Sequence, residues 1–321
     1  MVSYLLRGLI WIISYLPLRV LYFFSDILYY LLYYVVRYRR NVVRTNLRNA
    51  FPEKEGTELT RIEKKFYRNL GDIFVELYKP WHMSEQEMRR RCVFKHTEIL
   101  QKYYDQGRSV IGVLGHYGNW EWMASYALWT KGNIDFYTLY KPMHNKVMDQ
   151  LMIEIRSRFG ARPVPKNDIL RLIVSNLREG RLFLAGFIAD QTPNVNNLNF
   201  WMEFLHQDTP VFMGTEKIAR KFNLPVISLQ MKKLKRGYYE VDFVDLCGEP
   251  ALLAPGELTR MHTRFLEQQI QKAPEYWLWS HRRWKHKREE AVYLEENKGK
   301  KPEENKIKIK KERLAVFLSS Y

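Results

Sequence analysis

The sequence predicts an α/β fold, with a mostly parallel or mixed central sheet flanked by helices, preceded by an N-terminal hydrophobic membrane anchor. From Pro52 onward, short apolar runs alternate with segments of helical period, a pattern typical of α/β domains with covered strands. Residues 4–36, before this region, are almost all apolar. We find no internal repeat and no Pro-rich or Gly/Ser-rich linker, so we expect one main domain.

The N-terminal stretch, residues 4–36, consists mainly of Leu, Ile, Val, Tyr, Phe and Trp, interrupted by Arg7, Pro17, Arg19 and Asp26. A membrane-spanning helix needs about 20 apolar residues, so this stretch is long enough to cross a bilayer. Because charges interrupt it, a half-inserted hairpin, an interfacial helix or buried helices of a globular domain remain alternatives. No small-residue cleavage pattern follows, so we expect the segment to be retained.

A cluster of arginines follows at once: Arg37, Arg39, Arg40, Arg44 and Arg48. Such clusters stay on the cytoplasmic side and lie against anionic headgroups. The whole chain carries a net charge of +17, which attracts nucleic acid, an anionic membrane surface or an acidic carrier protein without choosing among them. We divide the chain into a membrane anchor at 1–40, a catalytic domain at 41–286 and a basic tail at 287–321.

The central elements follow from apolar runs and helical spacing. We expect strands at residues 109–114, 134–140, 181–188, 225–231 and 238–246, and helices at 145–159, 168–177 and 214–222. Gly160, Gly180 and Asn223 are placed to end these helices. Since strands and helices alternate, the sheet should be largely parallel.

The most informative stretch is the glycine-rich turn GHYGNWE at residues 115–121. It places His116 after a strand, where open α/β sheets bind ligands, and makes Asn119 the expected N-cap of a helix from Trp120. If the turn at Gly118 folds the imidazole back, Glu121 can hold one ring nitrogen and leave the other as a base. From the spacing alone, a structural histidine bonded to backbone fits His116 equally well.

Competing catalytic motifs are missing from the sequence: it contains no GxSxG, GxxxxGK[ST], HExxH or GxGxxG pattern. An oriented imidazole can deprotonate an alcohol, which then attacks a thioester directly. That chemistry requires neither a catalytic serine nor a metal. We therefore expect no metal and no resident cofactor.

The full GHYGNWE string resembles the bacterial lipid A biosynthesis acyltransferase family, the late lauroyl and myristoyl transferases within the lysophospholipid acyltransferase superfamily. Further matching segments lie at 40–47, 50–52, 140–142, 156–160, 189–191 and 274–284, so the resemblance covers most of residues 1–285. It implies a glycerolipid acyltransferase-like fold on the cytoplasmic side of the bacterial cell inner membrane. It also implies acyl transfer from acyl carrier protein, with coenzyme A as the alternative donor, to a hydroxyl of a lipid A precursor.

Roles for individual residues follow from the same resemblance. His116 is expected to be the general base and Glu121 its orienting carboxylate. Arg156 or Arg158 is expected to bind a phosphate or headgroup. The predicted substrate-binding set also contains Asp190, Gln191, Asn119 and Lys141. Asp190 follows an apolar strand, where it could position substrate, hold the arginines or simply cap a loop.

The sequence also allows other interpretations of the acceptor and of the function. The acceptor could instead be a lysophospholipid or an aminoacyl lipid, because the Tyr-rich anchor, the basic tail and residues 187–193 depart from better-known enterobacterial members. A thioesterase would use the same His and Glu with water, and a non-catalytic basic protein would bind membranes or nucleic acid; we expect no nucleic-acid partner. Trp277, Trp279 and Trp284 predict either a membrane-interface element or a core-packing strand.

Overall fold

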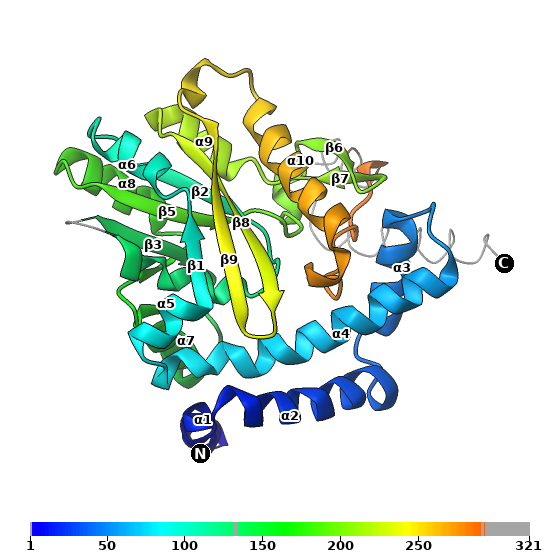
Figure 1. Cartoon of the computed structure of the whole chain (residues 1–321). Helices are drawn as coiled ribbons and strands as arrows, with labels where there is room; N and C mark the ends of the chain where they lie inside the picture. Colours follow the sequence, from blue (N-terminus) through cyan, green and yellow to red (C-terminus); the bar gives the residue numbers. More distant parts are fainter. Residues whose placement is uncertain (1, 131–133, 290–291, 293–321) are drawn as a thin grey trace.

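A central sheet with helices packed around it forms the body of the computed structural model, which describes residues 2–130, 134–289 and 292 (Figure 1). Seven strands make the main sheet, in the order β1-β9-β8-β2-β5-β3-β4, and β6 and β7 form a separate hairpin. All neighbouring pairs in the main sheet are parallel except β8 with β9. The predicted mixed α/β fold is therefore confirmed.

Five of the strands match the predicted apolar runs. The strands are β1 (Cys92–Lys95), β2 (Val110–Leu114), β3 (Asp135–Tyr140), β4 (Arg162–Pro165), β5 (Phe183–Ile188), β6 (Trp201–Phe204), β7 (Gln207–Pro210), β8 (Val226–Lys235) and β9 (Tyr238–Cys247). Central strands β2 and β5 are buried along almost their whole length, which explains their continuous apolar sequences. The four-residue edge strands β1 and β4 gave no such signal, and Pro163 and Pro165 suit β4 to an edge because proline lacks an N–H donor.

Ten α-helices lie in the part of the chain that the structure describes. They are α1 (Val2–Tyr15), α2 (Leu18–Tyr30), α3 (Arg40–Ala50), α4 (Gly56–Tyr78), α5 (Glu85–Arg91), α6 (Glu98–Tyr104), α7 (Lys146–Ser157), α8 (Ile169–Arg178), α9 (Gly214–Phe222) and α10 (Glu257–Lys272). Shorter turns are a π-helix η1 (Leu31–Val35) and the 3₁₀ helices η2 (Lys79–His82), η3 (Trp120–Trp129), η4 (Val195–Asn197), η5 (Pro250–Leu252) and η6 (Pro274–Tyr276). Helices α7, α8 and α9 match the predicted ranges, and Gly160, Gly180 and Asn223 have the positive φ angles expected of helix ends.

The hydrophobic core has a layer on each face of the sheet. On one face, α8, α9 and α10 contribute Ile173, Ala219 and Leu258. On the other face, residues of α5, α6 and η3, such as Trp122, pack with the tip of α2. A third cluster joins α3 and α4 to the segment around Trp277. The site described below lies where these layers meet.

The N-terminal apolar segment folds as two helices that lie against the domain. Helix α2 runs beside α4 (Figure 1), where a Cβ added at Gly71 would come within 2.9 Å of the Ser25 carbonyl oxygen. Residues Leu18–Val35 are long and apolar enough to cross a membrane, yet part of this stretch is buried against the protein. Phe23 and Ile27 lie on its opposite, exposed face. Most of the predicted basic tail, including its lysines from Lys298 on, lies outside the described residues.

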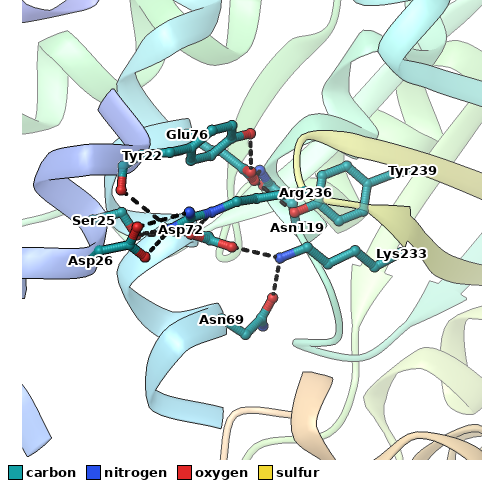
Figure 2. Close-up of polar contacts among 10 residues, drawn as sticks. All are labelled: Tyr22, Ser25, Asp26, Asn69, Asp72, Glu76, Asn119, Lys233, Arg236 and Tyr239. Carbon is teal, nitrogen blue, oxygen red and sulfur yellow. Dashed lines mark hydrogen bonds and ion pairs between the residues drawn. The ribbon is translucent and has the colours of Figure 1, made fainter. Parts of the chain in front are cut away.

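A buried polar network holds α2 in place and explains one of the charges in the apolar stretch (Figure 2). Asp72 of α4 accepts hydrogen bonds from Ser25 (2.8 Å), Lys233 (2.9 Å) and Arg236 (2.7 Å). Arg236, which follows β8, also pairs with Asp26 at 2.7 Å. Charged contacts therefore attach α2 to α4 and to the β8–β9 hairpin.

Candidate active site

Two parallel strands bring His116 and Asp190 together. Strands β2 and β5 are neighbours with Leu114 opposite Ile188, and each functional residue comes two positions after its strand ends. Gly115 lies between β2 and His116, and a Cβ at this position would be 2.7 Å from the Leu266 side chain and 3.3 Å from the Asp190 carboxylate. Glycine therefore leaves room for the carboxylate to lie close to the backbone here.

Asp190 is almost fully buried and accepts three hydrogen bonds. Its donors are the backbone N–H of His116 (2.8 Å), the imidazole Nδ1 of His116 (2.6 Å) and the indole Nε1 of Trp277 (2.8 Å). Burial opposes ionisation, but the His116 charge and these hydrogen bonds outweigh it and lower the pKa of Asp190 to about 2. A permanently ionised carboxylate therefore fixes the Nδ1 proton of His116 and leaves Nε2 free to accept one.

The same contact changes the pKa of His116. Burial of the imidazole disfavours its charged form, yet the attraction and hydrogen bond to Asp190 prevail, and the pKa of His116 is raised above 6.5. The edge of the Trp120 ring lies against the imidazole, with ring centroids 5.0 Å apart. His116 is thus a stronger base than a free histidine and is held in one orientation.

The predicted contact between His116 and Glu121 is corrected by the structure. Glu121 lies in the first turn of η3 and pairs with Arg156 of α7 through two hydrogen bonds of 2.8 Å each. The imidazole precedes the Gly118 turn and points to the end of β5 instead. Asp190, expected to position substrate or hold the arginines, is the orienting carboxylate.

The structure also corrects the prediction that the Asn119 side chain caps the helix that begins at Trp120. Asn119 is fully buried, its side chain accepts no hydrogen bond from the first turn of η3, and its amide nitrogen donates to Glu76 of α4 at 2.8 Å. Glu76 also accepts from the hydroxyls of Tyr22 and Tyr239, at 2.8 and 2.7 Å (Figure 2). Asn119 therefore anchors the turn that carries His116 to α4.

Comparison with known proteins identifies the family of this chain. A family model described as bacterial lipid A biosynthesis acyltransferase matches residues 1–286. The chain belongs to the bacterial lipid A biosynthesis acyltransferase family. It is accordingly an O-acyltransferase.

Individual relatives are distant in sequence but matched over most of their length. The chain is 24% identical to the lipid A biosynthesis palmitoleoyltransferase of Escherichia coli (strain K12) over 285 residues, covering 87% of this chain and 89% of the relative. It is 23% identical to the lipid A biosynthesis lauroyltransferase of the same organism over 280 residues, with the same coverage. A lipid A biosynthesis acyltransferase of Haemophilus influenzae is 20% identical over 245 residues, or 75% of this chain and 74% of the relative.

Gln191 occupies the remaining face of the histidine in the acyltransferase. Its Nε2 lies 3.1 Å from Nε2 of His116. With the Nδ1 proton donated to Asp190, Nε2 is the acceptor and the Gln191 amide is the donor. Gln191 is exposed, so this contact is the one through which a ligand can approach the imidazole.

The other predicted binding residues lie apart from this cluster. Arg158, just after α7, is exposed and stacks over the Phe159 ring, with 5.4 Å between its guanidinium carbon and the ring centroid. Lys141, just after β3, is also exposed. In the part of the chain that the structure describes, neither forms a hydrogen bond or ion pair with His116, Asp190 or Glu121.

Trp277 is a residue of the site that the sequence did not assign, because its segment suited either a membrane-interface element or a core-packing strand. Its indole holds Asp190, and Trp277 and Trp279 are 2% and 0% exposed. The membrane-interface interpretation of this segment is therefore wrong, and core packing is right. Nearby, His281 Nε2 lies 3.2 Å from the backbone N–H of Thr192 and fixes the loop after Asp190.

A groove of about 330 Å³ opens beside the site; we call it the α4 groove. Leu70, Ile73, Phe74 and Leu77 of α4 give it an apolar wall. Trp120, Glu121 and Gln191 line its inner end, and Tyr38, Arg39, Leu278, Ser280 and His281 complete it. Its volume is at the lower end of small-ligand pockets, and its wall suits a hydrocarbon chain.

Proposed function

We propose that this acyltransferase moves a fatty acyl chain from acyl carrier protein to a hydroxyl of a lipid A precursor, with His116 as the general base. The observation that carries the proposal is the buried Asp190–His116 pair at the carboxyl ends of β2 and β5. The names of the relatives support lipid A as the acceptor class. The chain's charge of +17 suits an acidic carrier protein as donor.

In the proposed reaction, Nε2 of His116 takes the proton of the acceptor hydroxyl as its oxygen attacks the thioester carbonyl. The tetrahedral intermediate collapses with cleavage of the C–S bond, and the imidazolium returns its proton to the departing thiolate. Asp190 stabilises the imidazolium between these steps without taking its proton. No metal or cofactor is required by this sequence of bonds.

Approach of the acceptor requires a change at Gln191, because its amide occupies the position that the hydroxyl must take. We propose that the acceptor hydroxyl replaces this amide and donates to Nε2 in its place. Developing charge on the carbonyl oxygen would be met by the backbone amides that open η3, near Trp120 and Glu121.

Helices α1 and α2 are proposed to hold the enzyme at the cytoplasmic side of the inner membrane. Because α2 packs along the amphipathic helix α4 and is tied to Arg236, it would lie in the interface instead of crossing the bilayer. Its exposed face carries Phe23 and Ile27, and Val35 at the end of η1 is exposed as well. The basic residues around it would meet anionic headgroups.

The test is transfer of a labelled acyl chain from acyl carrier protein to a lipid A precursor by membranes carrying the wild type or His116→Ala. We expect acylated precursor from the wild type and a loss of at least about 100-fold in the variant. Equal activity of the variant would refute the catalytic assignment of His116. Free fatty acid in place of acylated lipid would identify a thioesterase, and product only with lysophospholipid or aminoacyl-lipid acceptors would change the substrate.

A further inference from the structure

A second hollow, of about 410 Å³, opens beside the α4 groove; we call it the arginine hollow. Its charged lining consists of Arg37, Arg39, Arg40, Arg44 and Arg282. Arg37 and Arg39 precede α3, and Arg40 and Arg44 lie in its N-terminal half. Arg282 lies more than 200 positions later. The two segments are joined by the Asn46 side chain, which donates to the carbonyl oxygens of Trp279 and His281 at 2.9 and 3.0 Å.

The hollow holds far more positive than negative charge. Arg40 and Arg44 share the single carboxylate of Glu63, at 2.9 and 3.1 Å. Arg39 donates to the carbonyl oxygen of Ser280, which carries no net charge. Arg37 and Arg282 form no hydrogen bond or ion pair through their side chains within residues 2–130, 134–289 and 292. Among the described residues, these five guanidinium groups therefore have one carboxylate partner, Glu63, which pairs with two of them.

The backbone that presents these side chains is strained. Arg37 and Arg39 have φ angles of +53° and +51°, in the left-handed region that glycine or asparagine usually occupies. Non-glycine residues with such φ angles are enriched at ligand-binding and switch sites. The strain and the unpaired charges are independent features of the same turn.

Two neighbours of the hollow indicate what kind of anion it would bind. Arg39 lines both the arginine hollow and the α4 groove, whose inner end is at Glu121 and Gln191. Val35 and Val36, which directly precede Arg37 at the end of the apolar segment, are 72% and 58% exposed. A ligand that binds in the arginine hollow and extends to the exposed valines and into the α4 groove would have an anionic group, an apolar part and a reactive group near His116.

We propose that the arginine hollow binds a phosphate group of the lipid acceptor while its hydroxyl lies at His116. Arginine suits this role because its planar fork donates two hydrogen bonds to phosphate oxygens. Arg156, one of the two residues first expected to bind phosphate, is already paired with Glu121, and the other, Arg158, does not line the hollow. The concave shape and the adjacent apolar residues favour a lipid phosphate over the acidic surface of a carrier protein. This inference rests on the proposed function.

The experiment compares wild type with Arg37→Ala/Arg282→Ala, using a phosphorylated lipid A precursor and the same lipid after enzymatic dephosphorylation. Arg48→Ala is the control. Arg48 is an exposed arginine of α3, the helix that carries Arg40 and Arg44, but it does not line the hollow. The readouts are KM for acceptor, KM for acyl carrier protein, and binding of each lipid in mixed micelles by the purified protein without donor.

We expect the double variant to weaken binding and raise KM at least about 10-fold for the phosphorylated lipid. For the dephosphorylated lipid, wild type and double variant should bind equally weakly, and Arg48→Ala should match the wild type throughout. An equal loss with both lipids would overturn the proposal in favour of general membrane attraction. A rise confined to the KM for acyl carrier protein would overturn it in favour of carrier docking. If the wild type transferred nothing, the proposed function would fail, while the binding measurement would still decide the phosphate site.

Discussion

Among single residues, Glu121 and Arg156 form a paired unit beside His116. Their side chains are 16% and 20% exposed, and burial, which lowers the pKa of Arg156, is outweighed by the bond to Glu121. Removing either partner leaves the other charge partly buried and unpaired, which is costly. The pair also joins η3 to α7, so it fixes the outer wall of the site.

We therefore expect strong coupling between the two. Glu121→Gln and Arg156→Gln should each lower kcat/KM, and the double variant should be about as active as the poorer single variant. The coupling free energy in a double-mutant cycle should be about 1–3 kcal/mol. Additive losses, or a much larger loss in Glu121→Gln than in Arg156→Gln, would show instead that Glu121 acts directly on the substrate.

The sequence predicted which residues lie near the site better than it predicted their partners. His116 and Asp190 each follow an apolar strand, and that position alone placed both at one edge of the sheet. Which carboxylate reaches the imidazole depends on the direction that the chain takes after Gly118. The spacing of residues in the sequence does not determine that direction. Glu76 left a weak signal as an acid on the buried face of an amphipathic helix.

At the level of elements, α2 is attached by two carboxylates that share Arg236. The Asp72 side chain is 7% exposed and also holds Lys233, whereas that of Asp26 is 54% exposed. Exposed ion pairs contribute little to stability, but removing one partner of a buried pair leaves an uncompensated charge. The two carboxylates should therefore differ sharply in their contribution.

Asp72→Ala should destabilise the protein by about 3–5 kcal/mol, because it leaves the buried ammonium of Lys233 with only the amide oxygen of Asn69 and removes one of the two carboxylates that hold Arg236. Asp26→Ala should cost less than about 1 kcal/mol. Thermal unfolding of both variants in detergent measures the difference, with Tm expected to fall by about 10 °C in the first and barely in the second. Similar Tm values for the two variants would contradict this account of how α2 is held.

Elements with a strong apolar pattern were predictable, and those without one were not. Strands β2 and β5 are buried on both faces and read as continuous apolar runs, whereas Arg162–Pro165 forms an edge strand from a proline-rich tetrapeptide. The expected helix after Asn119 is a 3₁₀ helix, since the Asn119 side chain binds Glu76 instead of capping. Tertiary contacts decided these cases.

For the whole molecule, the exposed apolar face of α1 and α2 is the feature to explain. These helices lie at one end of the protein, far from the loop that contains η5 (Figure 1). Phe23 and Ile27 are 63% and 50% exposed. An apolar face of this kind beside basic residues is typical of a membrane-interface helix.

We expect Phe23→Asp/Ile27→Asp to lower binding to anionic vesicles at least about 10-fold, because each side chain loses about 1.5–3 kcal/mol of apolar burial. Leu252→Asp is the control: Leu252 is 83% exposed but lies in η5, at the far end of the protein. Flotation with vesicles measures both. Equal losses in the two proteins would mean that the N-terminal helices are not the membrane-binding surface.

The measurement that tests the account most directly is the pH dependence of kcat/KM for wild type and Asp190→Asn. The base must be neutral, so kcat/KM should rise with pH through the pKa of His116, and Asp190 places that rise above pH 6.5 in the wild type. Asp190→Asn removes the charge that raises this pKa. The rise should therefore move to lower pH, while the maximal rate falls at least about 100-fold. An unchanged pH profile with a full rate in Asp190→Asn would contradict the central claim that Asp190 holds His116 as the catalytic base.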